Sequence, residues 1–232
     1  MAIKPIIFNT EMVQAVLDGR KTQTRRVIKP QPVKEGVFWR LGHAIWSMDD
    51  RVTPLYGHSL YNRMPYKPDD VLWVRETWGI GTRPCPFNGW KDGVEFRADE
   101  AFLADEYEDL PLYHVDSEKL YKYFENPPKG WKPSIHMPKE VARIFLKVTG
   151  VRLERLQAIT KEDVWNEGIV MEPFYHQEPE YYDQRHMIGL EYEQSVFAGM
   201  WDSINDKRGF GWESNPWVWV IEFERCEKPK EW

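Results

Sequence analysis

The sequence is poor in cysteine and has no long apolar run. Its two cysteines, Cys85 and Cys226, belong to no CxxC pair and to no Cys/His cluster with zinc-ligand spacing, so a disulfide framework and a structural zinc are not expected. No stretch approaches the roughly 18 apolar residues of a membrane span. The segment after Met1 has no apolar core like that of a secretory leader. We therefore expect a cytoplasmic protein without membrane association.

An excess of positive charge is also missing. The 31 Lys and Arg residues are outnumbered by 37 Asp and Glu residues, which gives a formal net charge of −6. General binding to nucleic acid rests on many contacts of Lys and Arg with phosphate, so this balance argues against it. Any nucleic-acid role needs a local basic patch, and residues 20–29 supply one. With 42% hydrophobic residues, the 232 residues have ample material for one large packed domain.

The most informative stretch is residues 19–26, Gly-Arg-Lys-Thr-Gln-Thr-Arg-Arg, called the basic segment below. Apolar residues at helical spacing predict a short helix over residues 11–18, and Gly19 suits the position just after its end. The basic segment is therefore interpreted as a helix exit, where Arg20 and Lys21 partly serve the negative end of that helix. Four cations and two hydroxyls in one turn can also hold an anion, or let an amine activate a hydroxyl.

The remaining pattern predicts an α+β protein. Runs rich in β-branched and aromatic residues predict strands over residues 6–8, 71–78, 94–97, 142–156 and 217–224. Helical spacing and capping signals predict helices over residues 161–166, after Thr160, and 192–204. Segments without a sustained period are interpreted as loops or excursions, at residues 33–68, 79–93, 126–138 and 171–189. About five or six strands with three helices favour a mixed or antiparallel sheet closed into a small barrel.

Several segments taken together resemble one family. They are the helix ending in Gly-Arg-Lys-Thr-x-Thr-x-Arg, the strand after Asp-Val-Leu, the stretch ITKEDVWNEGI at 159–169 and the last strand WVWVIEFER at 217–225. The combination resembles the ASCH domain family, and WVRETW and WKPSIHMP make it most similar to larger ASCH proteins of phages and prophages. The resemblance implies a single PUA-like β-barrel domain over 1–232 with flanking helices. Inserted loops are then expected near 33–68, 80–125 and 171–189.

The resemblance also implies a site. Small bacterial N4-acetylcytidine amidohydrolases, one branch of the family, use a lysine and a threonine of the basic segment and a glutamate of a later helix. These match Lys21, Thr24 and Glu167, and Arg26 matches the arginine that closes the motif. The chain departs from that branch in its greater length and in having polar residues at positions 23 and 25, where the branch tends to have apolar ones.

Amide hydrolysis gives each matched residue a role. Thr24 supplies a hydroxyl nucleophile, and Lys21 deprotonates it if the pKa of its amine is lowered. Glu167 either carries a proton to the leaving nitrogen or positions a water, while Arg26 or backbone N–H groups stabilise the oxyanion. The like charges that favour a lowered lysine pKa belong to Arg20, Arg25 and Arg26.

Arg20, Arg25 and Arg26 of the basic segment are also candidates for substrate binding. Four residues outside it are further candidates, and each also has a structural interpretation. Arg75 and Glu76, at the end of a predicted buried strand, either form an ion pair or contact a ligand. Trp78 is expected in the core unless its ring stacks on a base. His136 lies in a proline-rich loop, where a surface or structural role is the alternative.

Three functions are consistent with these observations. The first is hydrolysis of an amide on a modified nucleoside or nucleotide, with no metal or cofactor required. The second is an RNA-binding module, in one variant RNA-cleaving, in which the basic segment grips phosphate. The third is a phage-encoded protein that binds a host protein through its insertions. The expected partners are accordingly a nucleoside, a nucleotide, RNA or a host protein.

Overall fold

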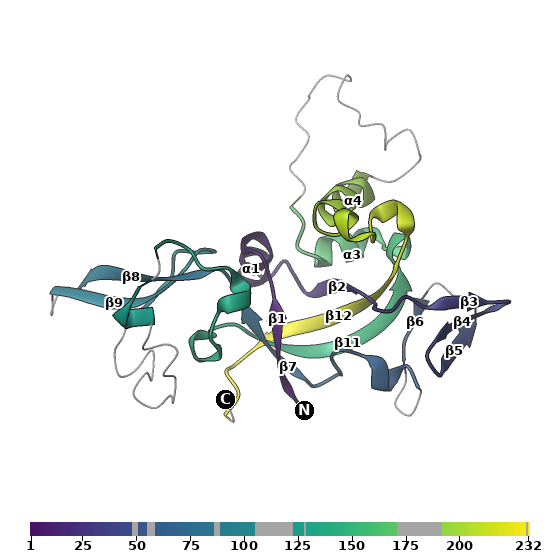
Figure 1. Cartoon of the computed structure of the whole chain (residues 1–232), viewed down its shortest axis with the longest axis horizontal. Helices are drawn as coiled ribbons and strands as arrows, with labels where there is room; N and C mark the ends of the chain where they lie inside the picture. The colour runs from purple at the N-terminus through teal and green to yellow at the C-terminus, as the bar shows by residue number, and fades with distance from the viewer. Residues whose placement is uncertain are drawn as a thin grey trace, which may run out of the picture. The chain divides into compact units, whose positions relative to one another are not determined.

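A computed structural model describes residues 1–47, 51–54, 59–85, 89–104, 123–127, 129–170, 192–230 and 232. The predicted excursion at 171–189 lies outside these residues, as does much of the 80–125 insertion. The described chain is an α+β protein, which confirms the predicted class (Figure 1). It forms two compact units, each described by itself below. Unit 1 comprises Met1–Asp18, Asp70–Lys147 and Arg225–Trp232, and unit 2 comprises Gly19–Asp69 and Val148–Glu224.

The largest sheet is mixed. Its strand order is β1 (Ile3–Ile7), β7 (Val71–Arg75), β11 (Phe145–Arg155), β12 (Trp217–Cys226) and β2 (Gln23–Val27), with β6 (Arg51–Val52) paired to β11. Strands β1 and β7 are parallel, whereas β7 with β11, β6 with β11 and β12 with β2 are antiparallel. Within the described residues this path stays open, without a pairing that closes it into a barrel.

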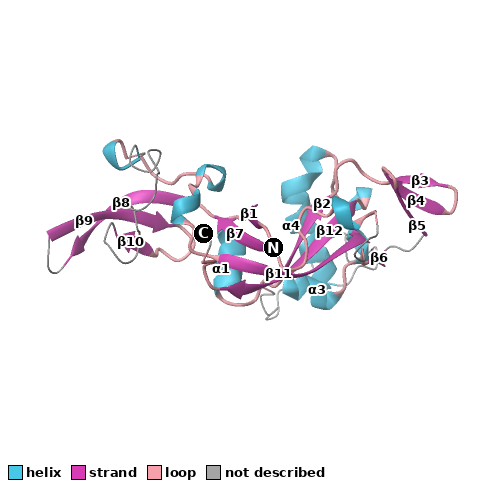
Figure 2. Ribbon diagram, turned by 90° about the horizontal axis from the view of Figure 1, so that it is seen from below, coloured by secondary structure: helices cyan, strands magenta, loops and turns pink. Residues whose placement is uncertain are grey.

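Helix α1 (Thr10–Leu17) in unit 1 follows the sequence prediction closely. Asn9 begins it, because its side-chain Oδ1 accepts a hydrogen bond from the backbone N–H of Met12 at 2.8 Å. The helix buries Val13 and Val16, and Figure 2 shows it beside strands β1 and β7. The core of the same unit gathers residues from β7, β8, β9 and β11, among them Val71, Trp78, Phe96 and Phe145.

Two smaller sheets correct the sequence interpretation. The predicted loop at 79–93 is instead a long hairpin of β8 (Trp78–Cys85) and β9 (Gly89–Phe96), with β10 (Phe102–Ala104) beside β9. Its glycines serve packing, because a Cβ at Gly93 would lie 2.4 Å from the carbonyl oxygen of Leu103.

The predicted irregular stretch at 33–68 likewise contains a three-stranded antiparallel sheet. It is formed by β3 (Val33–Glu35), β4 (Phe38–Leu41) and β5 (Ala44–Ser47). One face is buried through Leu41, Ala44 and Trp46, while Val33 and Phe38 stay exposed on the other. Apolar residues on both faces hide the period of two that would have predicted these strands.

Two helices cover one side of strands β2 and β12 in unit 2 (Figure 1). Helix α3 (Lys161–Asn166) has the predicted capping box, in which Thr160 and Asp163 each bind the other's backbone N–H at 3.2 Å. Helix α4 (Tyr192–Asn205) confirms the predicted amphipathic helix. No described helix has the length and apolarity needed to cross a membrane.

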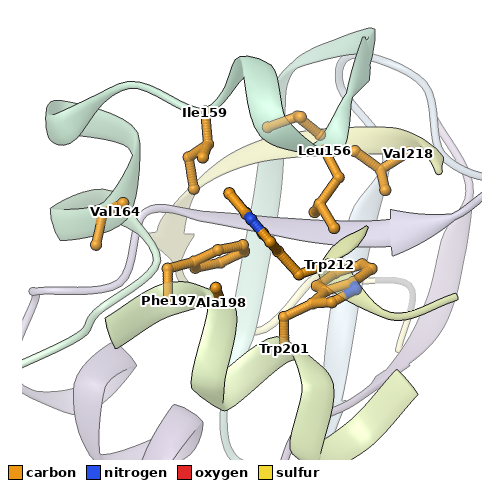
Figure 3. Packing of buried hydrophobic residues seen from close by; sticks show 9 residues of the cluster. Leu156, Ile159, Val164, Phe197, Ala198, Trp201, Trp212 and Val218 are labelled. Atoms are coloured by element: carbon orange, nitrogen blue, oxygen red, sulfur yellow. The ribbon is translucent and has the colours of Figure 1, made fainter. Parts of the chain in front are cut away.

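Aromatic side chains of helix α4 form the centre of the unit 2 core (Figure 3). The ring of Phe197 stacks on Trp201 at a centroid distance of 6.0 Å and meets Trp212 edge-on at 6.2 Å. Strand β12 adds Val218 to the same cluster. This packing holds α4 against β12, and β12 in turn pairs with β2.

Candidate functional site

The basic segment is divided between two kinds of structure. Its second half is strand β2, antiparallel to β12, and not the plain helix exit that was expected. Its first half binds the end of helix α3: Arg20 Nη1 donates to the carbonyl oxygen of Gly168 at 2.6 Å, and the N–H of Thr22 donates to that of Asn166 at 2.8 Å. Cationic and N–H donors are favourable at the negative end of a helix. The basic segment therefore joins α3 to the sheet.

Lys21 and Glu167 form a buried ion pair at this junction. Lys21 Nζ lies 2.8 Å from Glu167 Oε2, although the two residues are 146 positions apart, and it also donates to the Glu167 carbonyl oxygen at 2.8 Å. Their side chains are 0% and 3% exposed. Burial lowers the pKa of the Lys21 amine; Glu167 opposes this shift, whereas Arg26 and Arg25 add to it. The site thus holds an amine with an increased tendency to be neutral.

Arg25 occupies the other oxygen of the same carboxylate. Its Nη1 lies 2.9 Å from Glu167 Oε1, and its Nη2 lies 2.5 Å from Glu154 Oε1 and 3.1 Å from Asp163 Oδ2. The Arg25 side chain is 1% exposed, beneath the ring of Phe197 at 5.7 Å. Each oxygen of Glu167 therefore has its own nitrogen donor.

The two acids behind Arg25 are held by further cations. Arg152 lies 3.0 Å from Glu154 Oε2 and 2.7 Å from Asp163 Oδ1, and Arg51 also reaches both carboxylates, at 3.0 and 3.2 Å. Burial acts to raise the pKa of Asp163, but Arg25 and Arg152 outweigh it, with hydrogen bonds in support, and hold that pKa at about 2. The cations and acids alternate, so that each buried charge has an opposite neighbour.

Thr24 and Arg26 lie on the opposite face of β2 from Arg25, because side chains alternate along a strand. Thr24 is 1% exposed and pairs with Ile221 of β12. Arg26 is half-buried, and burial lowers its pKa against the opposing charges of Tyr66 and Glu167. Both matched residues are therefore in the same strand that presents Arg25 to Glu167.

The four other sequence candidates belong to unit 1. Of the two alternatives for Arg75 and Glu76, the ion pair between them is not formed: Arg75 donates to the carbonyl oxygen of Ile135, and Glu76 accepts from Arg143 at 2.9 and 2.8 Å. Neighbouring residues at a strand end point to opposite sides and so find different partners. Trp78 is fully buried in the core, whereas His136 is exposed in the short helix η3 (Ser134–His136).

Sequence reasoning missed the acids that surround Arg25. Glu154 is 0% exposed in strand β11, and Asp163 was recognised only as a helix cap. One signal for these acids was present in the polar residues Gln23 and Arg25, which are buried in strand β2. Buried polar side chains need hydrogen-bond partners, so the two residues indicate that such partners lie nearby. Among the described residues no group of His, Cys, Asp and Glu could hold a metal ion.

Comparison with known proteins adds no support to the resemblance. No family model, curated protein or solved structure matches the chain. Membership of the ASCH family and the activity that it implies are therefore proposals, supported by the motifs and by the geometry of the buried ion pairs.

Proposed function

We propose that unit 2 hydrolyses an amide on a modified nucleoside or nucleotide, with N4-acetylcytidine as the first substrate to test. The observation that carries this proposal is the contact of Lys21 Nζ with Glu167 Oε2 at 2.8 Å. The amidohydrolase hypothesis required these two residues to meet, and local sequence gives no other reason for a lysine and a glutamate so far apart to be buried together. Thr24, the third matched residue, lies three positions after Lys21 and is also buried.

The proposed chemistry uses the lowered pKa of the Lys21 amine. In the proposed reaction Lys21 acts in its neutral form and accepts the proton of the Thr24 hydroxyl as the oxygen attacks the amide carbonyl carbon, which requires the Thr24 hydroxyl to reach Lys21 from the other face of β2. The resulting oxyanion is stabilised by a cation or by backbone N–H groups. When the intermediate collapses, the C–N bond breaks and Lys21 returns the proton to the leaving nitrogen. Water then hydrolyses the ester on Thr24 and releases the acid.

Glu167 is assigned the role of orienting Lys21 and polarising water, in preference to that of proton donor. Both carboxylate oxygens of Glu167 already accept hydrogen bonds inside the protein, from Lys21 at 2.8 Å and from Arg25 at 2.9 Å. Of the two roles open from the sequence, positioning suits these contacts better.

The cations of the basic segment bind groups inside the protein, which favours a small substrate over RNA bound through its phosphates. Arg20 donates to the Gly168 carbonyl, while Lys21 and Arg25 are held in buried ion pairs. A module that grips RNA keeps its cations at the surface, where they replace counterions on phosphate. The RNA-binding alternative and the host-binding alternative are retained as outcomes of the experiments below.

We also propose that the main sheet is the counterpart of a PUA-like barrel. The order β1, α1, β2 along the chain and the closing strand β12 beside β2 support this assignment. An experimental structure whose strand path closes on itself agrees with the barrel. A path that remains open in such a structure contradicts it.

The activity is tested by following release of cytidine from N4-acetylcytidine by chromatography. Wild type should react, while Lys21→Met, Thr24→Val and Glu167→Gln should each lose at least about a hundredfold, as expected for removal of a base or nucleophile. Thr22→Val is the matched control, because Thr22 is an exposed hydroxyl of the same segment and should keep wild-type activity. A wild type no faster than the three variants sinks the proposal.

RNA binding is measured on the same proteins at low and moderate salt. A phosphate grip predicts an affinity that falls steeply with salt and that depends on Arg20 and Arg26. The proposed enzyme predicts turnover that is nearly independent of salt. Capture of a host protein that survives loss of Lys21 and Thr24 supports the third alternative instead.

A further inference from the structure

We infer that Arg25 is a positioning residue that fixes the orientation and the charge of the Lys21–Glu167 pair. The catalytic consequence of this inference rests on the proposed function, whereas its geometric and electrostatic consequences do not. Arg25 stands where the amidohydrolase branch tends to have an apolar residue, so the matched motif does not supply this role.

Arg25 binds two carboxylates at once. One end of its guanidinium group binds Glu167 Oε1 at 2.9 Å, and the other end binds Glu154 Oε1 at 2.5 Å. Because a guanidinium group is planar and rigid, these two contacts fix the rotation of the Glu167 carboxylate. The second oxygen of that carboxylate then faces Lys21 Nζ.

The position of Arg25 is fixed in turn by its surroundings. Strand β2 places its backbone opposite Val220 of β12, and the ring of Phe197 covers its guanidinium group at 5.7 Å. Glu154 is held from its other oxygen by Arg152 at 3.0 Å. An arginine with this many fixed neighbours can transmit a precise orientation to Glu167, which a mobile surface arginine cannot.

Arg25 also affects the amine through its charge. Arg25, after Arg26, lowers the pKa of Lys21, and the charges that act on Lys21 include Glu167, Arg26 and Arg25. Loss of the Arg25 charge removes a repulsion and so favours the ammonium form of Lys21. Without Arg25 we therefore expect Lys21 to become neutral only at a higher pH.

The test uses the double variant Arg25→Met, Glu154→Met, which removes a buried pair and not a single charge, and compares it with Glu154→Gln, which shows the effect of the Glu154 charge alone. The Lys21 side chain is titrated by NMR through its ¹³Cε shift, with Lys21→Met to assign the signal. The Lys21 pKa should move up, and the rise of kcat/KM with pH should move in the same direction. Activity lost at pH 7 should be partly recovered at higher pH.

Two further variants separate charge from geometry. Arg25→Lys keeps the charge but not the planar fork, so the Lys21 titration should stay near that of wild type while kcat falls about tenfold or more. Arg51→Met is the matched control: Arg51 binds the same Glu154 and Asp163, is 45% exposed and has no contact with Glu167 among those described. It should leave the Lys21 titration much less altered than loss of Arg25 does.

The outcomes distinguish this inference from the proposed function. An unchanged Lys21 titration in the double variant overturns the inference, whether or not the protein hydrolyses amides. A Lys21 titration that moves up in a protein without amidase activity supports the inference and sinks the proposed function. Arg25→Lys with full activity overturns the geometric half of the inference.

Discussion

Loss of the Phe197 side chain should test most directly how the core of unit 2 stabilises the fold. It is 1% exposed, packs on Trp201 and Trp212 and covers the guanidinium group of Arg25. Truncation of a buried phenylalanine costs about 3–5 kcal/mol, because transfer energy is lost and a cavity remains. For a chain of this length, roughly 2–4 °C of melting temperature is lost per kcal/mol, so Phe197→Ala should melt about 6–20 °C earlier.

Thermal unfolding measures the melting temperature and urea unfolding the free energy, both followed by tryptophan fluorescence and by far-UV circular dichroism, whose coincidence checks for a single transition. Ile204→Ala is the matched control, since Ile204 lies two turns further along the same helix but is 37% exposed, and it should cost about 1 kcal/mol or less. The packing argument is refuted if Phe197→Ala costs no more than Ile204→Ala.

Two other predictions concern charge and close packing. The pKa of Asp163 is depressed to about 2 from its ordinary 3.8, so its contribution to stability is complete above about pH 4 and is lost as the pH falls towards 2. Urea unfolding at a series of pH values should show the free energy of unfolding falling over this range in wild type. The fall should be weaker in Asp163→Asn. Gly93→Ala should destabilise the β8–β9–β10 sheet by about 1–3 kcal/mol and speed amide exchange there, since its Cβ would lie 2.4 Å from a backbone oxygen. Gly79→Ala, whose Cβ would have only an ordinary contact at 3.5 Å, should change exchange little, and equal effects of the two would contradict the argument.

Elements with a signal inside a few neighbouring residues could be predicted from the sequence. The capping box of Thr160 and Asp163, the helix over residues 192–204 and the strand at 217–224 each carry such a signal, and the structure confirms all three. Their stability in isolation is slight, but their patterns do not depend on a distant partner.

Elements whose form depends on distant residues could not be predicted. Residues 79–93 of the β8–β9 hairpin were interpreted as a loop because their glycines look like turn residues, whereas Gly93 is required by the approach of the strand that holds Leu103. The contact between Arg25 and Glu154 joins residues 129 positions apart, and no spacing rule brings them together. Even Lys21 and Glu167 were linked only by a resemblance of motifs.

The division of the chain between the two units has a consequence for its synthesis on the ribosome. The polypeptide changes from one unit to the other after residues 18, 69, 147 and 224. Neither unit is thus a continuous stretch that a single cut could isolate. Unit 2 is complete once residue 224 has emerged, while unit 1 still waits for residues 225–232, including Trp232, whose ring meets Phe145 at 5.0 Å and Trp73 at 5.6 Å. All residues of the unit that holds the buried ion pairs therefore leave the ribosome before unit 1 is complete.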